Sequence, residues 1–168
     1  MTIAIKGLHH NAYRCRDAEE TRKFYEDFLG LPLAETLELK QSKTGRAVEA
    51  VHIFFELGDG SFLAFFEVPG MPFEFKKQHD FDLHIALEVD AKTLDQMFAK
   101  GKTADIETRG ISDHEFCRSI YFRDPNGYVI ELTARVPEKE AMLDPKTNGA
   151  RAKLDAWQAA KRAHAPAK

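Results

Sequence analysis

The chain repeats one order of secondary structure twice, and this repeat limits its fold more than any other feature. Residues 3–68 predict a strand, a helix and three strands, and residues 82–135 predict the same order again. A curved four-stranded unit cannot cover its own open face. We therefore predict an α+β fold of two βαβββ modules, related by a pseudo-twofold axis, that form an open barrel around a cleft.

The helix of each repeat is marked at both ends. The first helix follows Asp17 and ends at Gly30, and the second follows Asp90 and ends at Gly101. An aspartate at the start and a glycine just past the end are typical helix boundaries. The expected strands cover residues 3–15, 32–39, 48–57 and 62–68 in the first repeat, and 82–89, 103–109, 118–123 and 128–134 in the second.

The two repeats are joined by a linker and followed by a tail. Residues 69–81 carry prolines, a glycine and charges, as linkers do, and residues 137–168 form a charged tail. Within the tail, residues 149–163 predict an amphipathic helix with Leu154 and Trp157 on one face. The sequence leaves open whether this helix frays, docks on its own domain or docks on a partner subunit.

Composition excludes several classes of protein. The 168 residues are 43% hydrophobic and 30% charged, with a net charge of −3, which is the balance of one soluble domain. No basic run interleaves with aromatic residues, so we expect no nucleic-acid partner. No apolar stretch reaches the roughly 20 residues of a membrane helix, and no secretory signal begins the chain. Cys15 and Cys117 fit no metal or redox spacing, which favours reduced thiols in a cytoplasmic protein.

Two histidines occupy equivalent places in the two repeats. His10 lies seven residues before Asp17, and His84 lies six residues before Asp90. Glu131 stands in an apolar strand of the second repeat, where a carboxylate is costly to bury unless it is paired or coordinated. Two imidazoles and one carboxylate suit a divalent first-row metal, so these three residues predict a metal site.

These motifs resemble the vicinal-oxygen-chelate superfamily. This superfamily includes glyoxalase I, methylmalonyl-CoA epimerase, fosfomycin-resistance thiol transferases, bleomycin-binding proteins and extradiol ring-cleaving dioxygenases. The resemblance covers about residues 5–135 and rests on His10, Asp17, Phe24-Tyr25, Leu29-Gly30, His84, Asp124-Pro125-Asn126-Gly127 and Glu131. It implies that His10, His84 and Glu131 are metal ligands, with Fe(II) the first expectation and Mn(II), Ni(II) or Zn(II) the alternatives. It also implies a small-molecule substrate and a homodimer, whose barrel forms within one chain or between two.

Members of the superfamily differ at a fourth ligand position, for which Glu67 is a candidate. Glu131 lies four residues after Gly127, and the residue four after Gly60 is Ala64. Side chains alternate across a strand, so an offset of three residues turns Glu67 to the opposite face. We therefore expect Ala64 at this position and three protein ligands, unless a bulge brings Glu67 into the cleft.

Further residues match the extradiol dioxygenases, in which a tyrosine ten residues before the ligand glutamate hydrogen-bonds the substrate. Tyr121 stands at that spacing, and His114 lies in the loop where family histidines contact the substrate. Many members also carry an acid–base histidine near the position of Ser61, which this chain lacks. His79 in the linker would replace it if that loop folds over the cleft.

These features predict an extradiol-type dioxygenase that cleaves a catechol-like diol with O₂. Arg14 shares a strand face with His10 and could meet an anionic group of the substrate. One alternative is a glyoxalase-type lyase, isomerase or epimerase that uses the metal as a Lewis acid, which needs Glu67 in the cleft. A further alternative is a dimeric, bleomycin-resistance-like protein whose groove binds a planar ligand.

Overall fold

The structure is a computed structural model that describes residues 4–41, 45, 47–77, 79 and 81–163. The first module consists of β1 (Tyr13–Arg14), α1 (Ala18–Arg22), the π-helix η1 (Lys23–Phe28), β2 (Leu33–Gln41), β3 (Ala47–Glu56) and β4 (Phe62–Glu67). The second consists of β5 (His84–Glu88), α2 (Ala91–Thr103), β6 (Thr108–Asp113), β7 (Cys117–Arg123) and β8 (Val129–Arg135). The 3₁₀ helix η2 (Pro137–Leu143) and α3 (Ala150–Ala163) follow.

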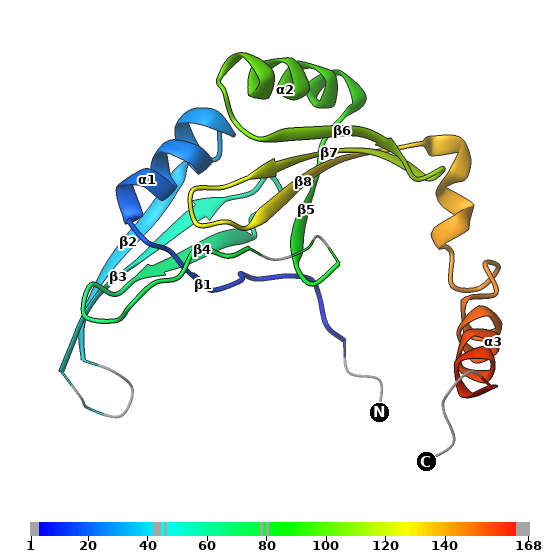
Figure 1. The fold of residues 1–168 in the computed structure, drawn as a ribbon, viewed down its shortest axis with the longest axis horizontal. Helices are drawn as coiled ribbons and strands as arrows, with labels where there is room; N and C mark the ends of the chain where they lie inside the picture. Colours follow the sequence, from blue (N-terminus) through cyan, green and yellow to red (C-terminus); the bar gives the residue numbers. More distant parts are fainter. Residues whose placement is uncertain (1–3, 42–44, 46, 78, 80, 164–168) are drawn as a thin grey trace.

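The two modules have the same topology. Their sheets are four-stranded, in the orders β1-β4-β3-β2 and β5-β8-β7-β6. In each module the first strand runs parallel to the last, and the other neighbours are antiparallel. The predicted βαβββ repeat and C-terminal helix are thereby confirmed, and the two sheets stay open and separate (Figure 1).

Each sheet has one face against the helices and one face away from them, here called the helix face and the open face. In β4, Leu63 and Phe65 belong to the buried core on the helix face, which also holds Tyr25 of η1. Ala64 lies between them and therefore points to the open face, as predicted from its register with the hairpin glycines. In β8, Ile130 and Leu132 take the helix face in the same way.

The modules contact each other through the turn between β7 and β8. Asp124 in this turn is 2% exposed, and its carboxylate accepts a hydrogen bond from the Tyr25 hydroxyl of the first module at 3.0 Å. Asn126 accepts one from the Arg16 backbone N–H at 2.8 Å, and the ring of Phe28 packs edge-on against Phe122. These contacts join the two modules through a shared core.

The second helix is longer than predicted. It continues through Gly101 to Thr103, so the next strand begins at Thr108 instead of residue 103. A Cβ atom at Gly101 would overlap the Thr108 hydroxyl and the Phe122 ring. This glycine therefore allows the helix to approach the sheet closely. It does not mark the end of the helix, as we had predicted.

The first strand is shorter than predicted. Only Tyr13–Arg14 form regular ladder pairs, with Phe65 and Phe66 of β4, and His10 adds one isolated bridge to Phe62. Residue 3, where the expected strand begins, lies outside the described part. The linker between the modules crosses the second one, where the Lys76 N–H donates to the Asn126 carbonyl at 2.8 Å.

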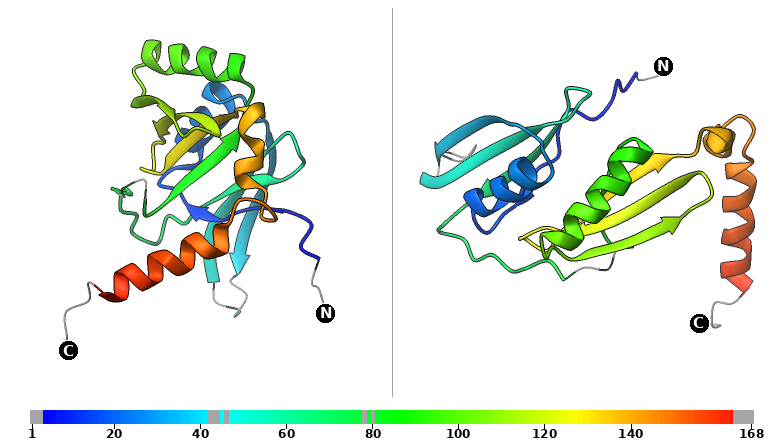
Figure 2. Two further views of the ribbon diagram at one scale, coloured as in Figure 1. Left: turned by 90° about the vertical axis from the view of Figure 1, so that its right-hand side faces the viewer. Right: turned by 90° about the horizontal axis from the view of Figure 1, so that it is seen from above.

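The C-terminal residues leave the body of the molecule. Helix η2 forms the start of the charged tail, and α3 then points away from both sheets (Figure 2). Among the described helices, none is long and apolar enough to cross a membrane.

Candidate metal centre

The open face of the second sheet gathers polar side chains that the sequence places far apart. Glu131 of β8 pairs with Ala86 of β5 on one side and with Tyr121 of β7 on the other. His84 lies two residues before Ala86 and so shares its face. Its Nε2 lies 3.2 Å from Oε2 of Glu131, which brings two of the three predicted ligands together.

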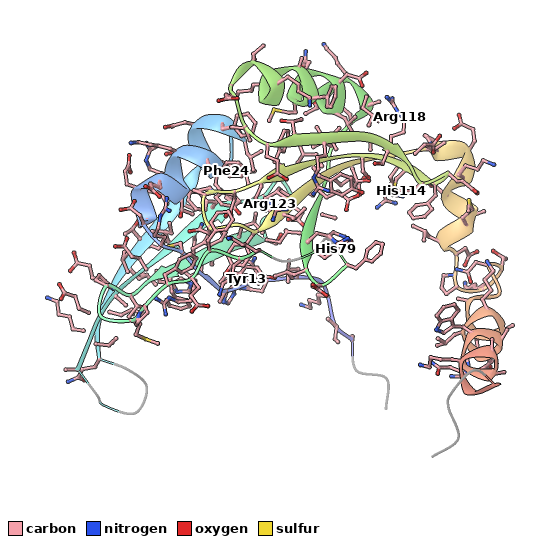
Figure 3. The ribbon with its side chains drawn as sticks, in the orientation of Figure 1. Tyr13, Phe24, His79, His114, Arg118 and Arg123 are labelled. Carbon is pink, nitrogen blue, oxygen red and sulfur yellow. The ribbon has the colours of Figure 1, made fainter. Side chains whose placement is uncertain are left out.

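A hydrogen-bonded chain continues from this pair. The Tyr121 hydroxyl lies 3.4 Å from Oε1 of Glu131 and 2.9 Å from Nε2 of His114. His114 is the first residue of the β6–β7 loop and faces the side of the sheet from which η2 descends (Figure 3). The residues predicted for metal binding and for proton handling in this module thus form one continuous group.

This group lines a pocket of about 540 Å³. Every lining residue comes from the second module or from Phe81 just before it, and none comes from the first module. Aromatic and cationic groups also line the pocket: Arg109 lies over the Tyr121 ring at 5.5 Å, and Phe81 and Phe116 are among the lining residues. The lining residues are Phe81, His84, Ala86, Arg109, Gly110, Ser112, His114, Phe116, Cys117, Tyr121, Glu131 and Thr133.

Glu131 is 7% exposed, although it carries a carboxylate. A buried carboxylate is costly unless it is hydrogen-bonded, paired or bound to a cation. Imidazole nitrogen and carboxylate oxygen are both common ligands of first-row divalent metals. The donor chemistry of His84 and Glu131 therefore fits such a metal, and a complete site needs at least one more donor.

His10 belongs to the open face of the first module. Its Nδ1 lies 2.8 Å from Nδ1 of His9, and its ring is close to those of His52 and Phe54. In the part of the chain that the structure describes, no three His, Cys, Asp or Glu side chains are grouped closely enough to hold a metal ion. One chain thus brings two of the predicted ligands together and leaves His10 with a different set of neighbours.

His52 is a residue of this face to which sequence reasoning assigned no role. It is 8% exposed, its ring stacks on that of Phe66 at 3.6 Å, and its Nε2 has no hydrogen-bond partner. Burial, together with the neighbouring His10, lowers the pKa of His52. Strand alternation could have indicated its place. His52 lies two residues before Phe54 and so shares its strand face, and Phe54 pairs with Ala64 on the open face.

Arg14 shares the open face of β1 with His10, as expected, but contacts the linker. Its guanidinium donates to the carbonyl oxygens of Met71 at 3.1 Å and of Val68 at 3.5 Å. His79 also stays within its own loop, where its Nδ1 accepts a hydrogen bond from the Phe81 N–H at 3.2 Å. Neither residue lines the pocket around Glu131.

Glu67 points to the helix face. Its Oε2 accepts a hydrogen bond from the Ala18 N–H at 2.7 Å, at the start of α1. A carboxylate at this position satisfies a free backbone donor and interacts favourably with the helix dipole.

The Glu67→Gln variant should therefore lose stability without losing metal. We expect the free energy of unfolding to fall by about 1 kcal/mol, because the charge at the helix start is removed. Metal content, measured by elemental analysis of the same samples, should stay at the wild-type level. A sharp loss of metal would instead return Glu67 to the ligand set.

The two cysteines differ in accessibility. Cys15 is 1% exposed, and burial raises its pKa to about 11, whereas Cys117 is partly exposed and lines the pocket. At pH 8 only about one Cys15 thiol in a thousand would be ionised. We expect a thiol reagent such as DTNB to label one cysteine rapidly in the native protein and two after unfolding. The Cys117→Ser variant should lack the rapid phase, and a persistent rapid phase would contradict the assignment.

The comparisons with known proteins agree with this fold. The model of the Glyoxalase/Bleomycin resistance protein/Dioxygenase superfamily matches residues 7–132, and the chain belongs to this superfamily. No curated protein matches the chain.

Solved structures with the same fold come from several bacteria. A glyoxalase/dioxygenase from Nostoc punctiforme is 24% identical, with a TM-score of 0.60 over 81% of this chain and 97% of that one. A variant of the fosfomycin resistance protein FosX from Listeria monocytogenes, in complex with Mn(II) and 1S,2S-dihydroxypropylphosphonic acid, is 22% identical, with a TM-score of 0.61 over 82% and 99%. A domain from Frankia sp. EAN1pec is 18% identical, with a TM-score of 0.62 over 79% and 100%. At these identities the likeness concerns the fold.

Proposed function

We propose that the chain is a metal-dependent dioxygenase of the extradiol type, with each active site shared by two copies. His84 and Glu131 of one copy and His10 of the second would hold one divalent metal. The observation that carries the proposal is the pocket of the second module. It holds His84 and Glu131 3.2 Å apart, in a hydrogen-bonded group with Tyr121 and His114, and none of its lining residues comes from the first module.

A second copy supplies what this half-site lacks. The open face of the first module carries His10 and Ala64, and a twofold dimer would set this face against the pocket of the partner twice, in equivalent contacts. The ligand set of two imidazoles and one carboxylate favours Fe(II), with Mn(II), Ni(II) and Zn(II) as alternative occupants.

The substrate class follows from the number of ligands. Because Ala64 offers no donor and Glu67 turns to the helix face, the protein supplies three ligands and leaves neighbouring coordination positions open. A catechol fits such a site, since its two adjacent oxygens can both bind. His84, Glu131 and His10 of the second copy would hold the metal, which would supply a route for electron density from the catecholate to O₂. Both atoms of O₂ end on the carbons of the broken ring bond, so no external reductant is consumed.

Tyr121 and His114 orient the catechol and accept the proton that it releases. The Tyr121 hydroxyl is placed beside Glu131 and donates a hydrogen bond to the substrate oxygen bound next to that carboxylate. His114, at 2.9 Å from the same hydroxyl, accepts the proton that the catechol releases. The aromatic rings of Phe81 and Phe116 in the pocket lining pack against a planar substrate and limit the access of water.

The proposal is tested by anaerobic reconstitution with each of the four metals, followed by oxygen-electrode assays against a panel of catechols. Wild-type protein should consume O₂ and form a yellow ring-cleavage product with Fe(II) or Mn(II) only. Glu131→Gln should lower the rate by about 100-fold or more, while Glu67→Gln, the same change on the opposite face of a strand, should stay within about twofold of wild type. Tight metal binding without O₂ uptake would replace the proposal by Lewis-acid lyase or isomerase chemistry. Failure to bind any metal would replace it by a ligand-sequestering role.

A further inference from the structure

We infer that η2 and α3, here called the C-terminal arm (residues 137–163), pack against the first module of a second copy of the chain. The inference rests on the shared site proposed above and adds the surface that holds the two copies together. The match to the family ends at residue 132, before the arm begins.

The arm exposes an apolar face to solvent. In α3, Leu154 is 51% exposed and Trp157 is 66% exposed, and in η2 Leu143 is 62% exposed. Figures 1 and 2 show α3 standing clear of both sheets. A helix of 14 residues is marginally stable in water unless its apolar face packs on something. The arm therefore needs a partner surface.

The arm begins at the rim of the pocket that lacks a wall. The Val136 N–H, directly before η2, donates to the Phe116 carbonyl at 2.9 Å, and Phe116 lines the pocket. His114 lies on the side of the sheet that faces η2 (Figure 3). Any chain that completes the pocket from this side must lie next to the arm.

The first module of a second copy offers a matching surface. Ile5 is 85% exposed and Leu8 is 62% exposed, and they lie five and two residues before His10 in the chain. If His10 of the second copy joins His84 and Glu131, these two apolar side chains enter the space beside the arm with it. Burial of apolar groups from both copies would then stabilise the dimer.

The experiment uses Trp157, which is the single tryptophan of the chain. The full-length protein is diluted across its dissociation range while sedimentation velocity and tryptophan emission are recorded in parallel. Leu154→Glu places a charge on the apolar face, and Ala152→Glu places the same charge two residues away, about 200° around the helix. Metal content is measured on every sample by equilibrium dialysis.

We expect a wild-type dimer in which the Trp157 emission is blue-shifted and shifts to the red as the dimer dissociates. Leu154→Glu should raise the dimer dissociation constant by about 30-fold or more, and Ala152→Glu should leave it within about twofold. At high concentration Leu154→Glu should dimerise and regain metal.

Two results would overturn the inference and leave the shared site intact: a metal-binding dimer with solvent-exposed Trp157, or a Leu154→Glu dimer as tight as wild type. A blue-shifted Trp157 in the monomer would also overturn it, because the arm would then pack on its own chain. A protein that stays monomeric and binds metal stoichiometrically would overturn the shared site as well.

Discussion

Two chains that each bind no metal should bind it when they are combined. We expect His10→Ala and His84→Ala each to lose stoichiometric metal binding, because each removes one ligand from every shared site. In a mixed dimer, the intact His10 of one chain meets the intact His84 and Glu131 of the other. With random pairing, half of the dimers are mixed and one of their two sites is complete, so about a quarter of the wild-type sites should return.

The control for this experiment is a pair of variants on the same module. A mixture of the His84→Ala chain with the Glu131→Ala chain contains no complete site in any dimer, so metal binding should stay at background. The chains are mixed by refolding together, and the metal is counted by equilibrium dialysis with Fe(II) under anaerobic conditions. Equal recovery from both mixtures, or from neither, would show that the ligands of a site do not come from two chains.

Replacing Asp124 by alanine should cause the largest loss of stability of any single change in the inter-module turn. The carboxylate of Asp124 is buried and accepts hydrogen bonds from the Tyr25 hydroxyl, the Tyr128 N–H and both the N–H and the side chain of Asn126. Burial raises the pKa of this carboxyl, whereas these hydrogen bonds favour its charged form. Removal leaves several buried donors without an acceptor, so the free energy of unfolding should fall by about 3–5 kcal/mol.

Asp59 provides the matched control, since it lies in the corresponding turn of the first repeat. It accepts hydrogen bonds from the N–H and hydroxyl of Ser61, but it is exposed to solvent. Asp59→Ala should therefore cost about 1 kcal/mol or less, measured by urea unfolding monitored by circular dichroism. Similar losses for the two variants would mean that the Asp124 network does not hold the modules together.

The repeat and the strand faces were predictable because they depend on local patterns. Alternation along β4 placed Ala64 on the open face and Glu67 on the other, and the hydrogen bond from Ala18 to Glu67 agrees with that register. The helix starts were predicted from the same kind of signal, since Asp17 and Asp90 accept hydrogen bonds from Glu20 and Thr93 as N-caps do.

Gly101 shows where a local pattern misled. A glycine after an apolar helical segment is typical of a helix end. Here the absence of a side chain leaves room for the side chains of Thr108 and Phe122. Those residues are close to Gly101 only after the sheet has formed. The helix consequently continues past it, and the following strand starts later than predicted.

The sequence by itself determined the two βαβββ modules, the faces of their strands and the residue types available for a metal site. Each of these follows from spacing within a few turns or strand residues. Only the tertiary structure decided which of these residues meet: His84 and Tyr121 both contact Glu131, His10 lies near His52, and α3 packs on neither sheet. Such contacts join residues far apart in the chain, and their geometry depends on how the two modules pack through the Asp124 turn and the shared core, which no local pattern encodes.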